Sequence, residues 1–331
     1  MSERQRHSGT RRRALIGAAA AALLAGPVAT PALAQGFPSK PITLVIPFPP
    51  GGATDVQFRA LAAAASKELG QPIVVTNKAG VGGTLGPVTM ARTAAPDGYT
   101  VAVLPGTLYR LPHLLKSADW DPVNDFTYIV GLTAYSFAVT VAADSPWKTL
   151  QDLLADAKAK PDQLSFGTVG VGSTGHIASS RLLKAANVKM NYVPFKGAAE
   201  QQLALIGGHI QMVGDAGWGA QAKAGKIRPL ALMDGQRAKN WPNVPTLKEL
   251  GYDVVALSTL GIGGPKGMDP AVVRVLHDAF RKASKDPAFL NVLDMENQPE
   301  MYLDSAAYAR AAAEQFESDR RFVAELGLQK Q

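Results

Sequence analysis

The sequence predicts an α/β fold with two lobes. Apolar runs typical of strands alternate with helical patterns along most of the chain, which indicates sheets covered by helices. A strand, a glycine-rich loop and a helix start follow one another in two distant places, around 42–55 and 164–176. Once residues 1–34 are set aside as removable, some 297 of the 331 residues remain. That length exceeds what one hydrophobic core usually serves, so two lobes are expected.

The first 34 residues have the pattern of an export signal. Arg11–Arg13 precedes the small apolar run Ala14–Ala25, and Ala32–Ala34 fits the small-x-small cleavage rule. The segment Thr10–Leu15 also resembles a twin-arginine signal, so the export route stays open. The apolar run is shorter than the roughly 20 residues of a membrane crossing. We therefore expect cleavage after Ala34 and a mature protein in the periplasm.

Composition argues against several classes of function. The formal net charge is +7, but five arginines against one glutamate in residues 1–34 contribute +4 of it, which leaves +3. The remaining basic residues are scattered, so no nucleic-acid partner is expected. The chain has no cysteine, which excludes disulfides, thiol catalysis and Cys-ligated metals. No pair of histidines has the spacing of a helical zinc site, so we expect neither a metal nor another cofactor.

The N-terminal part of the first lobe follows a β-α-β-α-β order. We expect strands at Ile42–Ile46, Ile73–Thr76 and Thr100–Leu104, and helices at Asp55–Leu69 and around Leu85–Ala94. In the first helix the apolar residues share one face, and Gly70 stands where a C-terminal glycine belongs. Thr54, with Gln57 three residues later, fits the cap of its N-terminus. This order favours a parallel sheet.

A second series of elements begins near Phe137. We expect strands at Phe137–Val141, Leu164–Thr168, Met190–Pro194, Ile210–Val213 and Arg228–Met233, and helices at Leu150–Lys158, His176–Ala186 and Ala199–Ile206. The extended stretch Val254–Leu260 then returns to the first lobe, followed by helices at Pro270–Ser284, Pro287–Leu293 and Ser305–Leu326. Lobe 1 thus comprises 35–136 and 258–331, and lobe 2 comprises 137–257. Two crossings between lobes suit hinge closure around a ligand.

Two glycine loops are the candidate functional segments. The first is Pro47–Gly52 and the second is Gly167–His176, each between a strand and a helix. Glycines let the backbone approach a ligand, and a helix start offers unpaired N–H groups to an anion. Two such loops, far apart in sequence, suggest one small anionic ligand held from two sides. Tight turning in an α/β fold remains the simpler interpretation of each loop.

The second loop allows two further interpretations. Gly170–Gly175 matches the G-x-G-x-x-G dinucleotide pattern, but that site needs an acidic residue at the end of the next strand. The strand Asn191–Lys196 has none, which disfavours this interpretation. Ser173 with His176 could form a hydrolase pair, yet Val171 stands where a nucleophile elbow needs glycine. An exported Ser/His hydrolase stays as an alternative.

Motifs along the whole mature chain resemble one family. They are similar to those of Bug-type (TctC-like) receptors, the extracytoplasmic solute-binding proteins of the tripartite tricarboxylate transporter family. The similar segments are Phe37–Ile42, Pro47–Asp55, Gly70–Pro72, Asn77–Gly83, Ala95–Thr100, Val193–Gly197, Gly207–Ile210 and Asn243–Leu247. The resemblance implies a two-lobed, type II periplasmic-binding-protein (Venus-flytrap) fold without catalytic activity. It also implies a monomer that takes a small organic carboxylate to the membrane carrier subunits of a tripartite transporter.

The resemblance also implies which residues bind the ligand. In such proteins loop amides and hydroxyls of both lobes hold the carboxylate, and Asp55 and Asp215 would orient waters or an ammonium group. The ligand-binding residues implied are Phe48, Gly51, Gly52, Asp55, Ala79, Gly80, Gly82, Gly83, Thr107, Gly172, Ser173, Thr174, His176, Lys196, Gly197 and Asp215. Phe195 stands where the family usually has tyrosine. A ligand-sensing module for a signalling partner would share all these residues and stays open.

Overall fold

Two mixed β-sheets, each flanked by helices, organise the part of the chain that the computed structural model describes, residues 36–256 and 258–325. The expected export segment and its cleavage site lie outside these residues. The described residues from Pro38 onward form one compact unit. None of the described helices is both long enough and apolar enough to span a membrane.

The first sheet has six strands in the order β11-β4-β10-β3-β1-β2. Its strands are β1 (Ile42–Ile46), β2 (Ile73–Asn77), β3 (Thr100–Leu104), β4 (Phe126–Ala134), β10 (Thr259–Pro265) and β11 (Glu300–Leu303). Its helices are α2 (Ala53–Leu69), α3 (Leu85–Thr93), α4 (Thr107–Leu114), α9 (Pro270–Ala283), α10 (Pro287–Met295) and α11 (Ser305–Glu325), with a short 3₁₀ turn, η1, at Val81–Gly83. The lobe built on this sheet is called lobe 1.

The first sheet is mixed, whereas the sequence favours a parallel one. β1 pairs parallel with β2 and β3, and Val45 lies opposite Thr76 and Ala102. β10 runs antiparallel between β3 and β4. The chain re-enters lobe 1 at the edge of the sheet where β1 and β3 end. The returning strand, β10, must therefore run antiparallel to β3.

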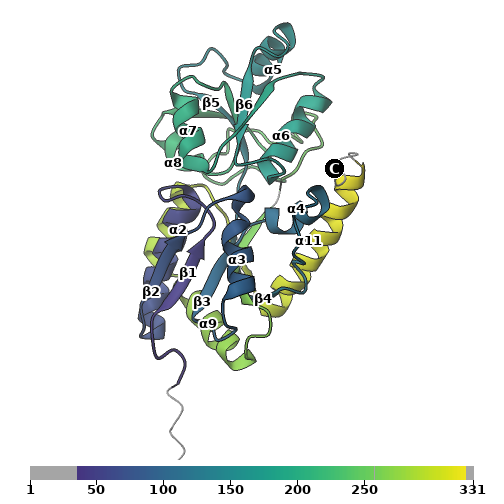
Figure 1. The fold of residues 1–331 in the computed structure, drawn as a ribbon. Helices are drawn as coiled ribbons and strands as arrows, with labels where there is room; N and C mark the ends of the chain where they lie inside the picture. The colour runs from purple at the N-terminus through teal and green to yellow at the C-terminus, as the bar shows by residue number, and fades with distance from the viewer. Residues whose placement is uncertain (1–35, 257, 326–331) are drawn as a thin grey trace, which may run out of the picture. The chain divides into compact units, whose positions relative to one another are not determined.

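The second sheet has five strands in the order β7-β6-β8-β5-β9. Its strands are β5 (Ala138–Ala142), β6 (Ser165–Thr168), β7 (Asn191–Pro194), β8 (Met212–Asp215) and β9 (Ile227–Leu232). Its helices are α5 (Leu150–Ala159), α6 (Thr174–Ala185), α7 (Ala198–Ile206) and α8 (Gly219–Lys223), which Figure 1 shows around β5 and β6. Leu150, Leu153 and Leu182 are fully buried beneath this sheet. The lobe built on it is called lobe 2.

The helix after the first glycine loop begins earlier than expected and without the expected cap. α2 starts at Ala53 with Gly52 at the N-cap, and no side chain of the described residues caps it. The hydroxyl of Thr54 instead lies 2.5 Å from the hydroxyl of Tyr135. The helix ends as predicted, because Gly70 adopts the left-handed conformation with φ of 65°.

The chain passes between the sheets twice, after β4 and before β10. The two crossover segments are joined by a hydrogen bond from the Tyr135 amide to the Ser258 carbonyl, 2.9 Å. Within the stretch Val254–Leu260, which was expected to be extended, a strand begins only at Thr259. Val254 and Ala256 are instead buried in the core of lobe 2, because this stretch is still crossing between the lobes. The exact lobe boundaries stay a prediction.

Candidate ligand-binding site

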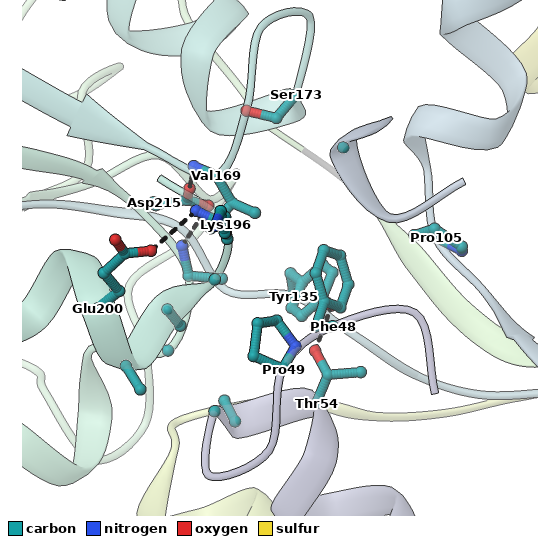
Figure 2. Close-up of a pocket in the computed structure, with 18 of the residues that line it drawn as sticks. Phe48, Pro49, Thr54, Pro105, Tyr135, Val169, Ser173, Lys196, Glu200 and Asp215 are labelled. Carbon is teal, nitrogen blue, oxygen red and sulfur yellow. Dashed lines mark hydrogen bonds between the residues drawn. The ribbon is translucent and has the colours of Figure 1, made fainter. Parts of the chain in front are cut away.

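A cavity of about 510 Å³ lies where loops from both lobes meet (Figure 2). Part of the predicted ligand-binding set lines it, namely Phe48, Gly52, Gly82, Thr107, Ser173, Thr174, Lys196, Gly197 and Asp215. Sequence reasoning missed other lining residues, among them Pro49, Tyr135 and Ser258. Tyr135 and Ser258 belong to the crossovers and carry no motif, so no local pattern could have identified them.

The N-termini of four helices line this cavity, two from each lobe. α2 and α4 come from lobe 1, and α6 and α7 come from lobe 2. α2, α4 and α7 have glycine at the N-cap, and no side chain caps them within the described chain. Only α6 is capped, by Ser173. In α4 the amides of Leu108 and Tyr109 donate to the carbonyls of Pro105 and Gly106. The unpaired N–H groups that, with the positive end of the helix dipole, favour an anion therefore lie mainly at the starts of α2 and α7.

The N-termini of α2 and α7 meet across the two lobes. A Cβ atom at Gly52 would lie 3.9 Å from the amide nitrogens of Ala198 and Ala199. One at Gly197 would lie only 2.9 Å from Cδ of Pro49. Gly217, with φ of 75°, lies beside both helix starts, because a Cβ there would be 2.9 Å from that of Ala198 and 3.3 Å from that of Ala53. Glycine is needed at this junction because the two backbones approach so closely.

The polar side chains of the cavity come mainly from lobe 2. The Asp215 carboxylate accepts hydrogen bonds from the amides of Val169, 2.7 Å, and Ala216, 2.8 Å. Burial raises the pKa of Asp215 to about 6, although these hydrogen bonds act in the opposite direction and lower it. Lys196 is exposed, and its amide donates to Glu200 at 3.2 Å. Asp215 therefore holds the loop after β6, and Lys196 brings a cationic side chain to the rim.

Aromatic rings form the other wall. Figure 2 shows Phe48, Pro49 and Tyr135 grouped together, apart from Asp215, Lys196 and Glu200. The Tyr135 hydroxyl is hydrogen-bonded to the Thr54 hydroxyl. Tyr135 therefore lines the cavity with its ring. Gly83 packs against the Phe48 ring. A Cβ at Gly83 would lie 2.6 Å from this ring, so glycine leaves the room that the ring needs. Gly83 thus supports the wall without lining it.

Asp55 is a predicted site residue that the structure places outside the cavity lining. Its carboxylate accepts from the Gly51 amide at 2.9 Å, from Asn77 Nδ2 at 2.7 Å and from Arg59 Nε at 2.9 Å. Burial would raise the pKa of Asp55, but the hydrogen bonds from Arg59 and Asn77 outweigh it and lower the pKa. Asp55 therefore shapes the first glycine loop. Gly51, Ala79 and Gly80 do not line the cavity either.

Gly172 and His176, also predicted, lie beside the cavity rather than in its wall. A Cβ at Gly172, where φ is 76°, would lie 2.9 Å from Cδ1 of Leu114 in lobe 1. His176 Nδ1 accepts from the Gly172 amide at 3.2 Å, and its ring lies 4.1 Å from that of Tyr192. This glycine loop therefore packs against α4 of the other lobe.

Ser173 and His176 do not form a nucleophile–base pair in the described structure. Ser173 Oγ accepts from the backbone amide of His176 at 3.1 Å, which is the N-cap of α6. The imidazole of His176 instead accepts a hydrogen bond at Nδ1 from the Gly172 amide. Burial lowers the pKa of His176. The geometry is that of helix capping rather than proton transfer from a serine.

A buried arginine joins the two lobes and is held by an ion pair within lobe 1. Arg110 of α4 donates from Nη2 to Asp319 Oδ1 of α11 at 3.0 Å, and both side chains are nearly inaccessible. Its Nη1 reaches the Gly172 carbonyl at 3.2 Å and Thr174 Oγ1 at 3.3 Å. Sequence reasoning missed Arg110, because a lone arginine in a short helix carries no signal. Among the described residues, no cluster of three His, Asp or Glu side chains could hold a metal ion.

Comparisons with known proteins agree with this arrangement. The sequence profile "Tripartite tricarboxylate transporter family receptor" matches residues 57–328. The chain is 44% identical to the "UPF0065 protein in gbd 5'region" of Cupriavidus necator, over 96% of this chain and 97% of that protein.

Solved structures show the same fold. The periplasmic binding protein BugD superposes with a TM-score of 0.84 at 27% identity, covering 89% of this chain and all of that one. The R. palustris protein Rpa4515, solved with adipate, gives 0.83 at 25% identity, with 89% and 100% covered. The chain is therefore a two-lobed, Bug-type member of the tripartite tricarboxylate transporter family of receptors, which are periplasmic solute-binding proteins.

Proposed function

We propose that this protein captures a small organic carboxylate between its lobes and delivers it to the membrane carrier of a tripartite transporter. The observation that carries the proposal is the set of four helix N-termini around one cavity, three of them without a side-chain cap. Backbone amides are permanent donors, so they hold an anion at any pH at which it is ionised. A family of non-enzymatic receptors, and a relative solved with adipate, support the same function.

The carboxylate is proposed to bind where α2 and α7 meet. Ala53, Thr54, Ala198 and Ala199 would donate their amides, and Lys196 would add a positive charge at the rim. Gly52, Gly82, Thr107, Ser173, Thr174, Gly197 and Asp215 belong to the proposed site as well, because they line the cavity. Phe48 supports the ligand body. In this proposal the protein acts as a monomeric receptor rather than an enzyme.

The remaining expectations complete the proposal. Residues 1–34 are removed on export after Ala34, and the receptor works in the periplasm. Residues 35–136 with 258–331 form lobe 1, and 137–257 form lobe 2. The two crossovers act as the hinge, since they are joined by the bond from Tyr135 to Ser258.

A screen of mature protein against mono-, di- and tricarboxylates tests this function. A ligand at about 100 times its Kd stabilises the folded state by roughly 2.7 kcal/mol, which raises the melting temperature. The uncharged amides of the same acids are the matched controls and should cause no shift. The proposal is contradicted if no acid shifts the melting temperature and none is retained in native mass spectrometry. Uptake in a strain without the carrier subunits separates delivery to a transporter from sensing.

A further inference from the structure

A second cavity, of about 720 Å³, lies beside the first crossover and is built by both lobes. Residues 135–136 of the crossover line it, together with residues from 234–240 of lobe 2 and from 290–300 of lobe 1. Tyr135 lines the first cavity as well, and no other described residue lines both. The second cavity therefore lies next to the proposed carboxylate site but is a separate space.

Asp234 lines this second cavity with a carboxylate that has no cationic partner. Its Oδ2 accepts a hydrogen bond from the Ser136 hydroxyl, and its Oδ1 lies 3.4 Å from the amide nitrogen of Phe137. No described lysine, arginine or histidine forms an ion pair with it. Burial raises the pKa of Asp234 to about 6, so the carboxyl group is ionised at pH 7.5. A partly buried carboxylate in this state gains free energy from a cation beside it.

Most other charged side chains of the second cavity are already neutralised. They pair within the chain, Asp294 with Lys223 at 2.6 Å, Glu300 with Lys285 at 2.9 Å and Arg237 with Glu249 at 3.0 Å. Lys239 also lines the cavity, but it is exposed and makes no ion pair with Asp234. Asp234 is thus the carboxylate that this cavity leaves open to a ligand.

The Asp234 carboxylate is held in a fixed position. The Ser136 hydroxyl that donates to it also accepts from Asn297 Nδ2 of lobe 1 at 3.1 Å. The carbonyl of Ser136 accepts from Trp218 Nε1 at 3.1 Å. Because residues of both lobes fix Ser136, the carboxylate needs little ordering before it binds a ligand.

Gln298 is a second polar residue of this cavity whose hydrogen bonds are unmade. It is 5% exposed and belongs to the lining. Its Oε1 and Nε2 are both buried, and neither has a hydrogen-bond partner within the described chain. An unpaired buried amide costs free energy, which a polar ligand at this wall would relieve. Val255, which is 45% exposed, and Leu290 add apolar surface from the two lobes.

We propose that this second cavity binds a small organic cation, a primary alkylammonium, whose nitrogen pairs with Asp234 and whose apolar body lies against Val255 and Leu290. A primary ammonium carries three N–H donors, and Gln298 offers it a further acceptor. A metal ion fits less well, because no three His, Asp or Glu side chains among the described residues come together to hold one. The proposal goes beyond the carboxylate site and does not depend on it.

The test compares amines with alcohols of the same carbon chain. Mature protein at pH 7.5 is titrated with butylammonium and hexylammonium, and in parallel with 1-butanol and 1-hexanol, and NMR chemical shifts report binding. Ligands of this size should bind with a Kd on the order of 1 mM or tighter. Each alcohol lacks the charge that Asp234 pairs with, so it should bind about tenfold more weakly than its amine, or not at all.

Two matched variants locate the amine. Asp234→Asn removes the charge but keeps an oxygen for the Ser136 hydroxyl, so it should weaken amine binding about tenfold or more. Asp294→Asn changes a carboxylate of the same cavity that already has Lys223, and should weaken amine binding less than about twofold. Val255→Trp fills the cavity from an exposed position. It should also abolish amine binding, and it carries the test if Asp234→Asn does not fold.

Each outcome decides for or against this site. Amines that bind no more tightly than their alcohols, or that bind Asp234→Asn and Val255→Trp as tightly as wild type, would overturn it. Equal losses in Asp234→Asn and Asp294→Asn would also overturn it, because the cavity would then attract cations without a specific partner. Selective loss in Asp234→Asn, with carboxylate binding within about twofold of wild type, would establish a second site that is independent of the first.

Discussion

The two glycine loops look alike in sequence but do different work in the structure. After the first loop, α2 begins without a side-chain cap, and Gly52, Ala53 and Thr54 line the cavity. After the second loop, α6 is capped by Ser173, and Gly172 packs against α4 of lobe 1. We propose that the N–H groups at the start of α2 serve a ligand, whereas the amides of Gly170, Gly172 and Ser173 in the second loop donate to partners within that loop and its helix.

The counterpart of the first loop in lobe 2 is the start of α7. Gly197 stands at its N-cap without a side-chain partner, and the helix meets α2 across the cavity. We therefore propose the uncapped start of α7, rather than the capped start of α6, as the lobe 2 side of the anion site. The capped loop serves the contact between lobes, and the uncapped helix starts are the proposed ligand groups.

The largest expected effect removes the ion pair within lobe 1 that positions Arg110 against the second loop. Asp319→Ala leaves the buried Arg110 without its carboxylate, which should lower the free energy of unfolding by about 3–5 kcal/mol. Glu317→Ala on the same helix breaks an exposed pair with Arg320 and should cost less than about 1 kcal/mol. Urea unfolding measures both. Equal losses would mean that the buried pair stabilises the fold no more than the exposed one.

Gly197→Val should affect binding more than folding. Its backbone is extended, with φ of −171°, so valine is not strained there, but its Cβ would meet Pro49 of lobe 1. Overpacking of about 1–3 kcal/mol should weaken carboxylate binding about ten- to hundredfold in calorimetry. Gly235→Val, where a Cβ meets nothing within 4 Å, is the control. Normal binding by Gly197→Val would refute the meeting of α2 and α7 as the ligand position.

Ser173→Ala sharpens the contrast between the loops. Loss of the cap of α6 should lower the free energy of unfolding by about 1 kcal/mol. Carboxylate affinity should fall less than about threefold, because the hydroxyl serves the His176 amide. Unfolding curves and ligand titrations of the same variant measure both quantities. A large loss of affinity with unchanged stability would return Ser173 to the group of main ligand contacts.

The smallest effect concerns pH and His176. Burial lowers the folded-state pKa of His176, so the unfolded chain binds more protons as pH falls below the ordinary value of about 6.5. This residue therefore stabilises the fold less at pH 5.5 than at pH 7.5. His176→Asn should lose less stability over that interval than wild type, whereas the exposed His209→Asn should behave like wild type. An unchanged pH dependence in His176→Asn would contradict this burial effect.

The helices and strands could be predicted from the sequence where the spacing of apolar residues is regular. Phe58, Leu61 and Ala65 of α2 are fully buried, as their spacing predicts. β10 runs antiparallel because the chain re-enters lobe 1 at the edge of the sheet where β1 and β3 end. No local sequence pattern indicates this point of re-entry. β4 was not anticipated, because residues 126–134 are buried almost throughout and show no alternation. α4, another element not anticipated, carries a proline inside, which is unusual for a helix.

The candidate site was only partly predictable. The segments that bear glycine loops were found, because glycine marks close backbone approach. The roles of these segments could not be predicted, because a single side chain decides whether a helix N-terminus is capped. Ser173 caps α6, whereas Gly197 has no side chain with which to cap α7. Asp55 and Asp215 are acidic residues beside loops, but the carboxylate of Asp215 accepts from backbone amides, and that of Asp55 accepts from the Gly51 amide and from the side chains of Arg59 and Asn77. Ser258 and Tyr135 reach the cavity only because the crossovers pass beneath it.

A crystal structure of the protein with the tightest acid from the screen tests the central claim most directly. The account predicts carboxylate oxygens within about 3 Å of the amide nitrogens of Ala53 or Thr54 and of Ala198 or Ala199. Wild type and Gly197→Val should be soaked side by side, and only wild type should hold the acid there. A carboxylate bound instead at the capped start of α6, or outside the cavity, would contradict the account.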